Sequence, residues 1–218
     1  QTRLNELFAN TSMPDLLVDG DSGPLTRQAL CAARMALDLR IDTIDMTEGS
    51  PEEVALFEAT SLSIPDGAAT WANRWILIDK SCQVMFTGEG DDGVVDVFPT
   101  STGDAGFETR PVVANPAFRF DPALDNDGWH DSTNFPVEID NPLNGNMYKP
   151  LYFNGGQAIH GANYVPPEPR SKGCARMFPW HQDRLLDWLG LDGITEATWN
   201  PSRLGVTVTV QGEYRPVE

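Results

Sequence analysis

The chain has 218 residues, of which 32 are acidic and 15 basic, and its formal net charge is -17. A surface field of that sign repels nucleic acid and anionic lipid, so we expect no nucleic-acid partner. Hydrophobic residues make up 40% of the sequence, enough for a folded core. No apolar run approaches the roughly 20 residues that span a bilayer, and the first residues, Gln-Thr-Arg-Leu-Asn, lack the order of a signal peptide, as we expect of a mature form.

Residues 1–60 are predicted to form a small domain of three helices. Leu4 and Phe8 fall on one face of a first helix, because residues four apart share a helix face. Pro24 and Pro51 each suit the first turn of a further helix, where the missing N–H costs little. The helical spacing of apolar residues after each proline supports these two starts.

Residues 61–71 are rich in Ser, Pro, Gly and Ala and are predicted to be a linker. Beyond it, short apolar runs typical of strands occur at residues 75–79, 83–86, 94–98, 152–153 and 206–210. Residues 88–93 suit a hairpin turn, and 182–191 suit a helix. We therefore expect an α+β protein in which a β-rich, sandwich-like domain over residues 72–218 follows the three-helix domain.

The three cysteines leave at least one thiol outside any intramolecular disulfide. Cys31 falls on the second predicted helix and Cys82 near the first strand of the β-rich part. A disulfide between them would join the two parts, and the chain-entropy model values the closed span at roughly 4 kcal/mol. Such a bond requires an oxidising compartment. Cys174 is then the odd thiol.

Cys174 lies in the run 171–176, Ser-Lys-Gly-Cys-Ala-Arg. In an extended backbone Lys172, Cys174 and Arg176 share one side, so two cations would flank the sulfur and favour a thiolate. Gly173 has no side chain, and its N–H and that of Cys174 could approach an oxyanion closely. The alternative for a single cysteine of this kind is inert packing.

A second segment, residues 153–161, ends in the pair His160-Gly161, fourteen positions before the cysteine. Together the two segments resemble the active-site signature of the L,D-transpeptidase (YkuD-like) family. That signature is a His, then a dozen or more residues, then Ser/Thr-His-Gly-Cys and an Arg or Asn two positions later. Five residues match it directly: His160, Ser171, Gly173, Cys174 and Arg176.

The likeness extends over residues 75–210. Residues 75–79 resemble the opening strand of the family and 98–103 resemble its Ser-Thr-Gly turn. Lys172 departs from the pattern, because the family usually has His there. In the N-terminal part, residues 16–30 resemble the signature of small peptidoglycan-binding modules, which predicts glycan contact; the alternative is a spacer that binds no glycan.

The resemblance implies a secreted or wall-associated enzyme that acts on peptidoglycan stem peptides and needs no metal or organic cofactor. Cys174 would be the nucleophile and His160 its base, with the ring oriented by the carbonyl of Gly161 and the oxyanion held at Gly173. Four residues are candidates for substrate binding: Arg176, Lys172, Ser171 and Tyr148. The alternatives are an L,D-carboxypeptidase with the same nucleophile and a non-catalytic wall-binding protein.

The remaining polar residues are weaker candidates for a functional role. His130 and His181 suit surface or packing roles. The acidic residues between 121 and 131 lack the ordered spacing and final Glu of a calcium loop. The long stretch 141–148 is rich in Gly and Asn and suits a substrate loop. Tyr148, at its end, is predicted to line the cleft.

Overall fold

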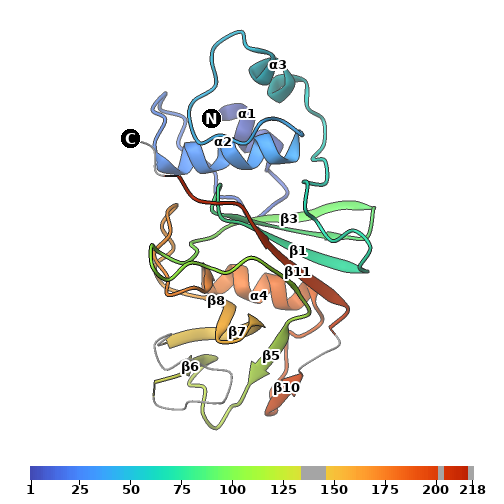
Figure 1. The fold of residues 1–218 in the computed structure, drawn as a ribbon, viewed down its shortest axis with the longest axis vertical. Coiled ribbons are helices and arrows are strands. Elements are labelled where there is room, and N and C mark those ends of the chain that lie inside the picture. Colours follow the sequence, from blue (N-terminus) through green and yellow to red (C-terminus); the bar gives the residue numbers. More distant parts are fainter. Residues whose placement is uncertain (134–145, 201–203, 216–218) are drawn as a thin grey trace.

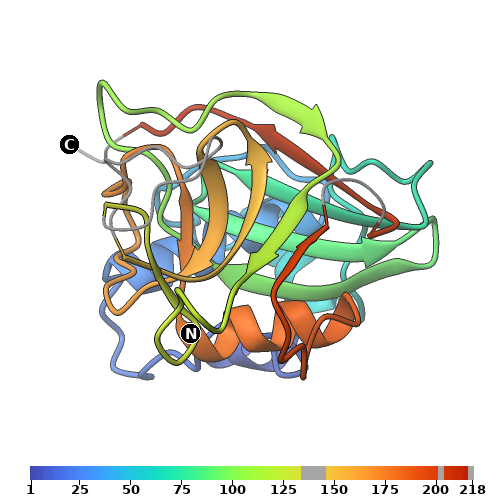
Figure 2. The same ribbon diagram turned by 90° about the horizontal axis from the view of Figure 1, so that it is seen from below.

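A computed structural model describes residues 1–133, 146–200 and 204–215. Two β-sheets pack face to face, and three N-terminal helices cover the outer face of the first sheet (Figure 1). The fourth helix runs along one side of the pair of sheets (Figure 2). The expected α+β architecture, with helices preceding a β-rich sandwich, is confirmed. Within the described residues, no helix is long and apolar enough to cross a membrane.

The described helices are α1 (Thr2–Leu7), α2 (Pro24–Ala36), α3 (Pro51–Glu58) and α4 (Pro179–Trp188). The first sheet has the order β3 (Gly93–Pro99), β2 (Val84–Glu89), β1 (Arg74–Asp79), β11 (Val206–Gln211) and β4 (Val112–Ala114). The second has the order β10 (Thr198–Asn200), β5 (Ala117–Phe120), β7 (Asn146–Asn154), β8 (Gln157–Gly161) and β9 (Ala175–Met177), and β6 (Trp129–Asp131) also pairs with β7. Two pairs are parallel, β1 with β11 and β8 with β9.

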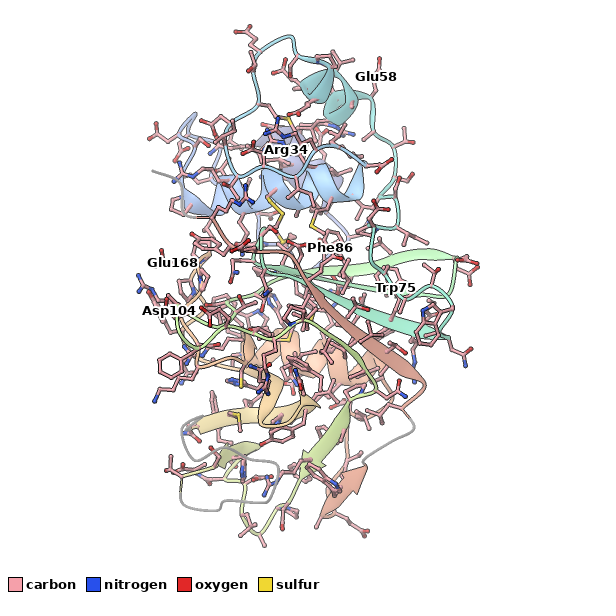
Figure 3. All side chains as sticks on the ribbon, viewed as in Figure 1. Arg34, Glu58, Trp75, Phe86, Asp104 and Glu168 are labelled. Atoms are coloured by element: carbon pink, nitrogen blue, oxygen red, sulfur yellow. A yellow bond between two sulfur atoms is a disulfide. The ribbon has the colours of Figure 1, made fainter. Side chains whose placement is uncertain are left out.

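Strand β1 is buried on both faces, which explains why its sequence is continuously apolar instead of alternating. Trp75 and Leu77 pack toward the N-terminal helices. Ile76 and Ile78 pack toward the second sheet and α4. Phe86 belongs to the first of these layers as well, and Figure 3 labels it together with Trp75. The helical unit and the sandwich therefore share the first sheet as a common wall.

The helix starts agree with the prolines of the sequence. Pro24 and Pro51 occupy the first turns of α2 and α3, and the Ser50 hydroxyl caps α3 by accepting from the Glu53 N–H at 3.2 Å. The expected helix over 182–191 begins three residues earlier, because Pro179 supplies a further N-terminal turn.

The longer strands lie where the apolar runs predict them, and residues 152–153 form part of the nine-residue β7. Sequence patterns missed β4, β5, β6, β9 and β10, which have only three or four residues each. So short a strand shows too little periodicity to be recognised, and it forms because neighbouring strands provide its hydrogen bonds. Residues 141–145 of the expected substrate loop lie outside the described residues.

The predicted disulfide is present between Cys31 of α2 and Cys82, which follows β1. Both cysteines are buried in the layer between the helices and the first sheet. The bond therefore fastens the helical unit to the sandwich at the centre of their shared core.

Reduction of the disulfide is expected to lower the free energy of unfolding by about 4 kcal/mol, because the unfolded chain regains the entropy of a long closed loop. Urea unfolding with and without reductant, followed by tryptophan fluorescence, measures the loss. A Cys174→Ala variant should lose the same amount under the same reductant. An unfolding midpoint that reductant does not move would contradict the prediction.

Candidate active site

The parallel pairing of β8 with β9 places the candidate catalytic residues on one face of the second sheet. The register aligns Ile159 with Ala175 and His160 with Arg176. Ile159 and Ala175 point into the core between the sheets. Strand side chains alternate, so His160, Arg176 and Cys174 belong to the opposite, outer face. Cys174 immediately precedes β9, which makes it a diagonal neighbour of His160.

The orientation of His160 is fixed by the residue that follows it. Its Nδ1 lies 2.9 Å from the carbonyl oxygen of Gly161. A carbonyl oxygen can only accept a hydrogen bond, so Nδ1 carries the proton and Nε2 of the neutral ring carries the lone pair. Burial lowers the pKa of His160 to about 4, with a further lowering by the charge of Arg176 and an opposing effect of the Gly161 hydrogen bond. Near pH 7 the ring is therefore neutral and can accept a proton.

Tyr148 on β7 pairs with Gly161, the residue after His160, and its ring faces helix α4. Its ring lies against Gly161, where an added Cβ would come within 2.9 Å of the tyrosine and 3.0 Å of the Pro179 Cα. Its other neighbours are Trp129, with ring centroids 5.3 Å apart, and Asp183 of α4, which accepts from the phenol at 3.0 Å. The expected place of Tyr148 in the substrate cleft stays a prediction, and its hydroxyl is already bound to Asp183 within the protein.

Cys174 is buried, with an exposed fraction of 3%. Its thiol donates to the carbonyl of Gly156 over a distance of 3.8 Å. The side chain packs in a small apolar cluster on the outer face of the sheet, with Met147, Tyr152 and Ala158. The nucleophile candidate therefore lies immediately before β9, the last strand in the order of the second sheet, and close to the turn between β7 and β8.

The turn that carries Cys174 is held by Ser171, which we expect from the sequence to bind substrate. Ser171 is buried, and its hydroxyl donates to the Cys174 carbonyl at 2.6 Å and accepts from the Gly173 N–H at 3.1 Å. Both hydrogen bonds are internal to the turn, and a substrate contact at Ser171 stays a prediction. The Gly173 N–H, expected to face an oxyanion, is likewise directed at Ser171.

Gly173 is required by the shape of the turn. Its φ of +109° lies in a region that side chains rarely adopt. A Cβ there would also come within 2.5 Å of the Gln157 Nε2. Gln157 is itself fixed, since its amide donates to the Glu108 carbonyl at 3.1 Å and accepts from the Arg110 N–H at 3.1 Å. The glycine thus lets Gln157, at the start of β8, pack directly against the turn of residues 171–174, here called the Cys174 turn.

Residues 100–104, which contain the expected Ser-Thr-Gly turn, pair with the nucleophile segment. Ser101 exchanges backbone hydrogen bonds with Arg176, and the Ser171 N–H donates to the Thr102 carbonyl at 3.0 Å. The segment directly follows β3 of the first sheet. It therefore ties the first sheet to the part of the second that carries Cys174.

The two cations predicted beside the sulfur have different positions. The positive φ at Gly173 breaks the extended run that was expected to align Lys172 with Cys174, so that alignment is wrong, and Lys172 is exposed in the turn. Arg176 does lie on the face of Cys174, is half-buried and interacts electrostatically with the cysteine. Its Nη1 donates to the Arg170 carbonyl at 3.0 Å. Substrate contacts of Lys172 and Arg176 stay predictions.

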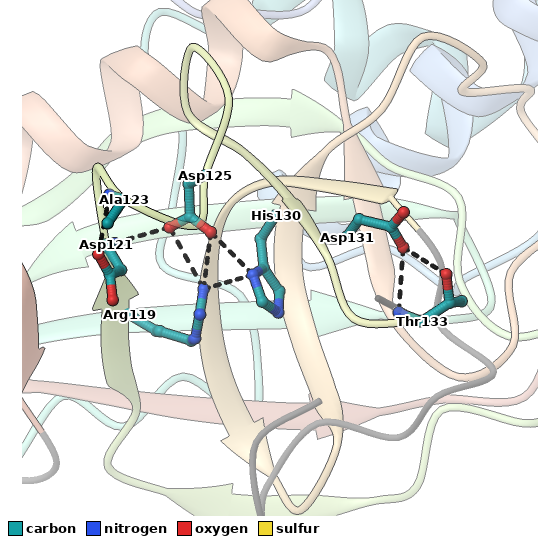
Figure 4. Close-up of polar contacts among 7 residues, drawn as sticks. All are labelled: Arg119, Asp121, Ala123, Asp125, His130, Asp131 and Thr133. Carbon is teal, nitrogen blue, oxygen red and sulfur yellow. Dashed lines mark hydrogen bonds and ion pairs between the residues drawn. The ribbon is translucent and has the colours of Figure 1, made fainter. Parts of the chain in front are cut away.

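A buried ionic cluster on the same face was not predicted from the sequence. The Arg119 Nη1 lies 2.9 Å from an Asp125 oxygen and 2.6 Å from the His130 Nδ1, which is itself 2.8 Å from Asp125 (Figure 4). Burial alone would raise the pKa of Asp125, but hydrogen bonds from His130, the Asp121 N–H and Arg119 lower it below its usual value. Among the described residues, no group of three or more His, Cys, Asp or Glu side chains could hold a metal ion.

The sequence held one signal for this cluster. Arg119 interrupts the otherwise apolar run Ala-Phe-Arg-Phe of β5, and an arginine at such a position is seldom buried without a partner. The partners Asp125 and His130 lie in a loop and in a three-residue strand, where no periodicity identifies them. The acidic residues considered for calcium include Asp125, whose carboxylate is occupied by this cluster.

Comparisons with known proteins agree with the geometry. The sequence profile of the YkuD family, the L,D-transpeptidase catalytic domain, matches residues 73–210. No curated protein matches the sequence. The structure is similar to that of an L,D-transpeptidase from Xylanimonas cellulosilytica, with 26% identity, a TM-score of 0.52, and 97% of this chain and 90% of that chain covered. An L,D-transpeptidase from Stackebrandtia nassauensis is 17% identical, with a TM-score of 0.46 and the same coverage of 97% and 90%.

The rate of Cys174 acylation is expected to fall only when the pH is lowered to about 4, because the lowered pKa of His160 keeps the ring neutral above that value. This fall in rate is the acid limb of the pH profile. The measurement is the second-order rate of acylation by a carbapenem between about pH 3 and 8, a range that also covers the usual histidine value of about 6.5. Burial also lowers the pKa of His181 to about 4, so a His181→Gln variant with an unchanged limb is the control. A limb near 6.5 in the native chain would contradict the assignment.

Replacement of Ser171 by Ala is expected to slow acylation of Cys174 by about fivefold to tenfold, because the Cys174 turn loses two buried hydrogen bonds. Ser171→Thr keeps the hydroxyl and is expected to retain most of the rate. Mass spectrometry of the acyl-enzyme over time gives both rates. If the Ala and Thr variants acylate equally fast, the hydroxyl does not position the turn.

Proposed function

Because the chain belongs to the YkuD family of L,D-transpeptidase catalytic domains, we propose that it cross-links peptidoglycan stem peptides through an acyl-enzyme on Cys174. The observation that supports this most directly is the buried His160, whose Nδ1–H is bound to the Gly161 carbonyl and whose pKa is lowered to about 4. A neutral ring with its lone pair on Nε2 is the form that a cysteine nucleophile requires of its base.

In the proposed acylation, the Cys174 thiol transfers its proton to the Nε2 of His160, and the sulfur attacks the stem carbonyl that follows an L-centre. A carbon–sulfur bond forms, the carbon–nitrogen bond to the next residue breaks, and the imidazolium returns the proton to the leaving amine. Arg176 favours the thiolate through its charge. The N–H of Cys174 supports the oxyanion, since it belongs to the residue whose sulfur attacks.

In the second step, an amine of another stem attacks the thioester. A carbon–nitrogen bond forms and the carbon–sulfur bond breaks, while His160 takes a proton from the amine and returns it to the sulfur. The product is a peptide cross-link and the original thiol. Attack by water in place of the amine would give the L,D-carboxypeptidase outcome with the same residues, and the two outcomes differ only in access of the acceptor.

The proposal also covers the domain organisation and the location of the chain. Residues 1–60, 61–71 and 72–218 are proposed as the helical unit, the linker and the catalytic domain. Glycan contact by the helical unit stays a prediction, and most of α2 is buried against the first sheet. The disulfide suits an extracytoplasmic location, either secreted or associated with the wall. No step of the proposed mechanism uses a metal or an organic cofactor.

Incubation with a carbapenem is expected to give one covalent adduct, mapped to Cys174 by peptide mass spectrometry, and none in a Cys174→Ala variant. With a disaccharide-tetrapeptide as donor, the native chain should form cross-linked product when an amine acceptor is added. Cys174→Ala should lose all turnover, because the sulfur forms the acyl-enzyme. Turnover that survives in Cys174→Ala would overturn the mechanism, and hydrolysed product alone in the presence of amine would favour the carboxypeptidase.

A further inference from the structure

A groove of about 930 Å³ runs over the outer face of the second sheet, along β5, β7 and β10. That volume is in the usual range of ligand sites, roughly 300–1,000 Å³. Its lining includes Arg119, Tyr152, Asn154, Gly156 and Trp199. The groove meets the candidate active site at Gly156, whose carbonyl accepts from the Cys174 thiol.

Two lining side chains present hydrogen-bonding groups that the protein does not use. Tyr152 is 2% exposed, and its hydroxyl has no partner among the described residues. The Nη1 of Arg119 donates to Asp125 and lies 2.6 Å from the His130 Nδ1. The other two nitrogens of Arg119, Nε and Nη2, make no hydrogen bond with the described residues. A buried polar group without a partner is costly, so the Tyr152 hydroxyl favours a ligand that brings an oxygen acceptor, and the free side of the guanidinium can donate to the same ligand.

The flanking aromatic ring suits the apolar part of the same ligand. Trp199 is 43% exposed and lies against Tyr152, with ring centroids 5.8 Å apart. The charge of Arg119 is balanced by Asp125, and the lining also contains Asp121, so the groove has no excess of positive charge. Such a lining suits the neutral carbonyl oxygens of a peptide with aliphatic groups beside them.

The position of the groove relative to His160 indicates which part of the substrate it takes. Gly156 lies in the turn before β8, Ala158 and His160 follow on the outer face of the strand, and Cys174 is level with Ala158. Tyr152 pairs with Ala158 on the other side. The groove therefore reaches Cys174 from the hairpin end of β8, whereas His160 reaches it from the opposite end.

The direction of proton transfer indicates which part of the substrate lies on the His160 side of Cys174 and which lies on the groove side. His160 must protonate the leaving amine and later take a proton from the attacking amine, so both amines occupy its side of Cys174. The acyl chain, which stays bound to the sulfur between these events, must extend away from that side. We propose that this groove binds the acyl-donor stem peptide upstream of the attacked carbonyl, with Tyr152 and Arg119 as specificity-determining contacts to its oxygens; the inference rests on the proposed function.

The test removes the hydroxyl without changing the shape of Tyr152. In a Cys174→Ala background, Tyr152→Phe is expected to weaken equilibrium binding of a disaccharide-tetrapeptide by about threefold to tenfold. In the native background the same substitution should raise the KM for this donor by a similar factor and leave the KM for the amine acceptor unchanged. The rate of Cys174 alkylation by iodoacetamide should not change, because that reagent does not need the groove.

A purely structural role of Tyr152 makes a different prediction. Loss of a structural hydrogen bond would lower Tm, whereas Tyr152→Phe removes a buried group that has no partner and should leave Tm equal or higher. Tyr214→Phe, a half-buried hydroxyl outside the groove, is the matched control and should change neither donor binding nor Tm. Arg119→Lys keeps a charge opposite Asp125 but loses the guanidinium fork, and it should also weaken donor binding.

Three results would distinguish the groove assignment from its alternatives. Donor binding that Tyr152→Phe leaves unchanged, in a protein with native Tm, would overturn the proposal. An increase in acceptor KM instead of donor KM would also overturn it. If the native chain binds the donor through Tyr152 but forms no acyl-enzyme, the proposed function fails while the groove assignment is supported.

Discussion

The hydrogen bond between the His160 Nδ1 and the Gly161 carbonyl decides which nitrogen of a buried ring can take a proton. The ring is also almost completely buried, and burial disfavours its charged form, so the ring stays neutral near pH 7. Parallel pairing of β8 with β9 then brings Cys174 to the same face. Gly161 lets β7 and α4 pack closely against β8, since any side chain there would collide with Tyr148 and Pro179. The proposed base and the proposed nucleophile are thus brought together by one short pair of strands.

The Cys174 turn depends on contacts that reach beyond its own sheet. Ser171 closes the turn internally, and its N–H donates to the Thr102 carbonyl. The Thr102 N–H and hydroxyl bind the side chain of Gln83, and the Gln83 carbonyl accepts from Gln28 of α2 at 2.6 Å. Gln83 follows Cys82 of the disulfide. A continuous polar path therefore connects the helical unit to the turn that carries Cys174.

Much of this could be predicted from the sequence, and the exceptions have physical causes. Apolar runs and helix-starting prolines identified the helices and the longer strands, and the pairing of Cys31 with Cys82 followed from their placement. Two groups of features were missed or misjudged. The short strand β5, with Arg119, depends on partners distant in sequence, and the turn before Cys174 depends on a glycine φ that residue spacing does not reveal. The expected alignment of Lys172 with Cys174 was therefore wrong.

The protonation state of His160 is the most direct test of the account. Nitrogen-15 NMR of the histidine-labelled protein, with the signal assigned by a His160→Gln variant, reports both ring nitrogens as the pH is lowered. The structure predicts a neutral ring with the proton on Nδ1 at pH 7, and protonation of Nε2 only near pH 4. A doubly protonated ring at pH 6, or a neutral ring with its proton on Nε2, would contradict the assignment of His160 as the base.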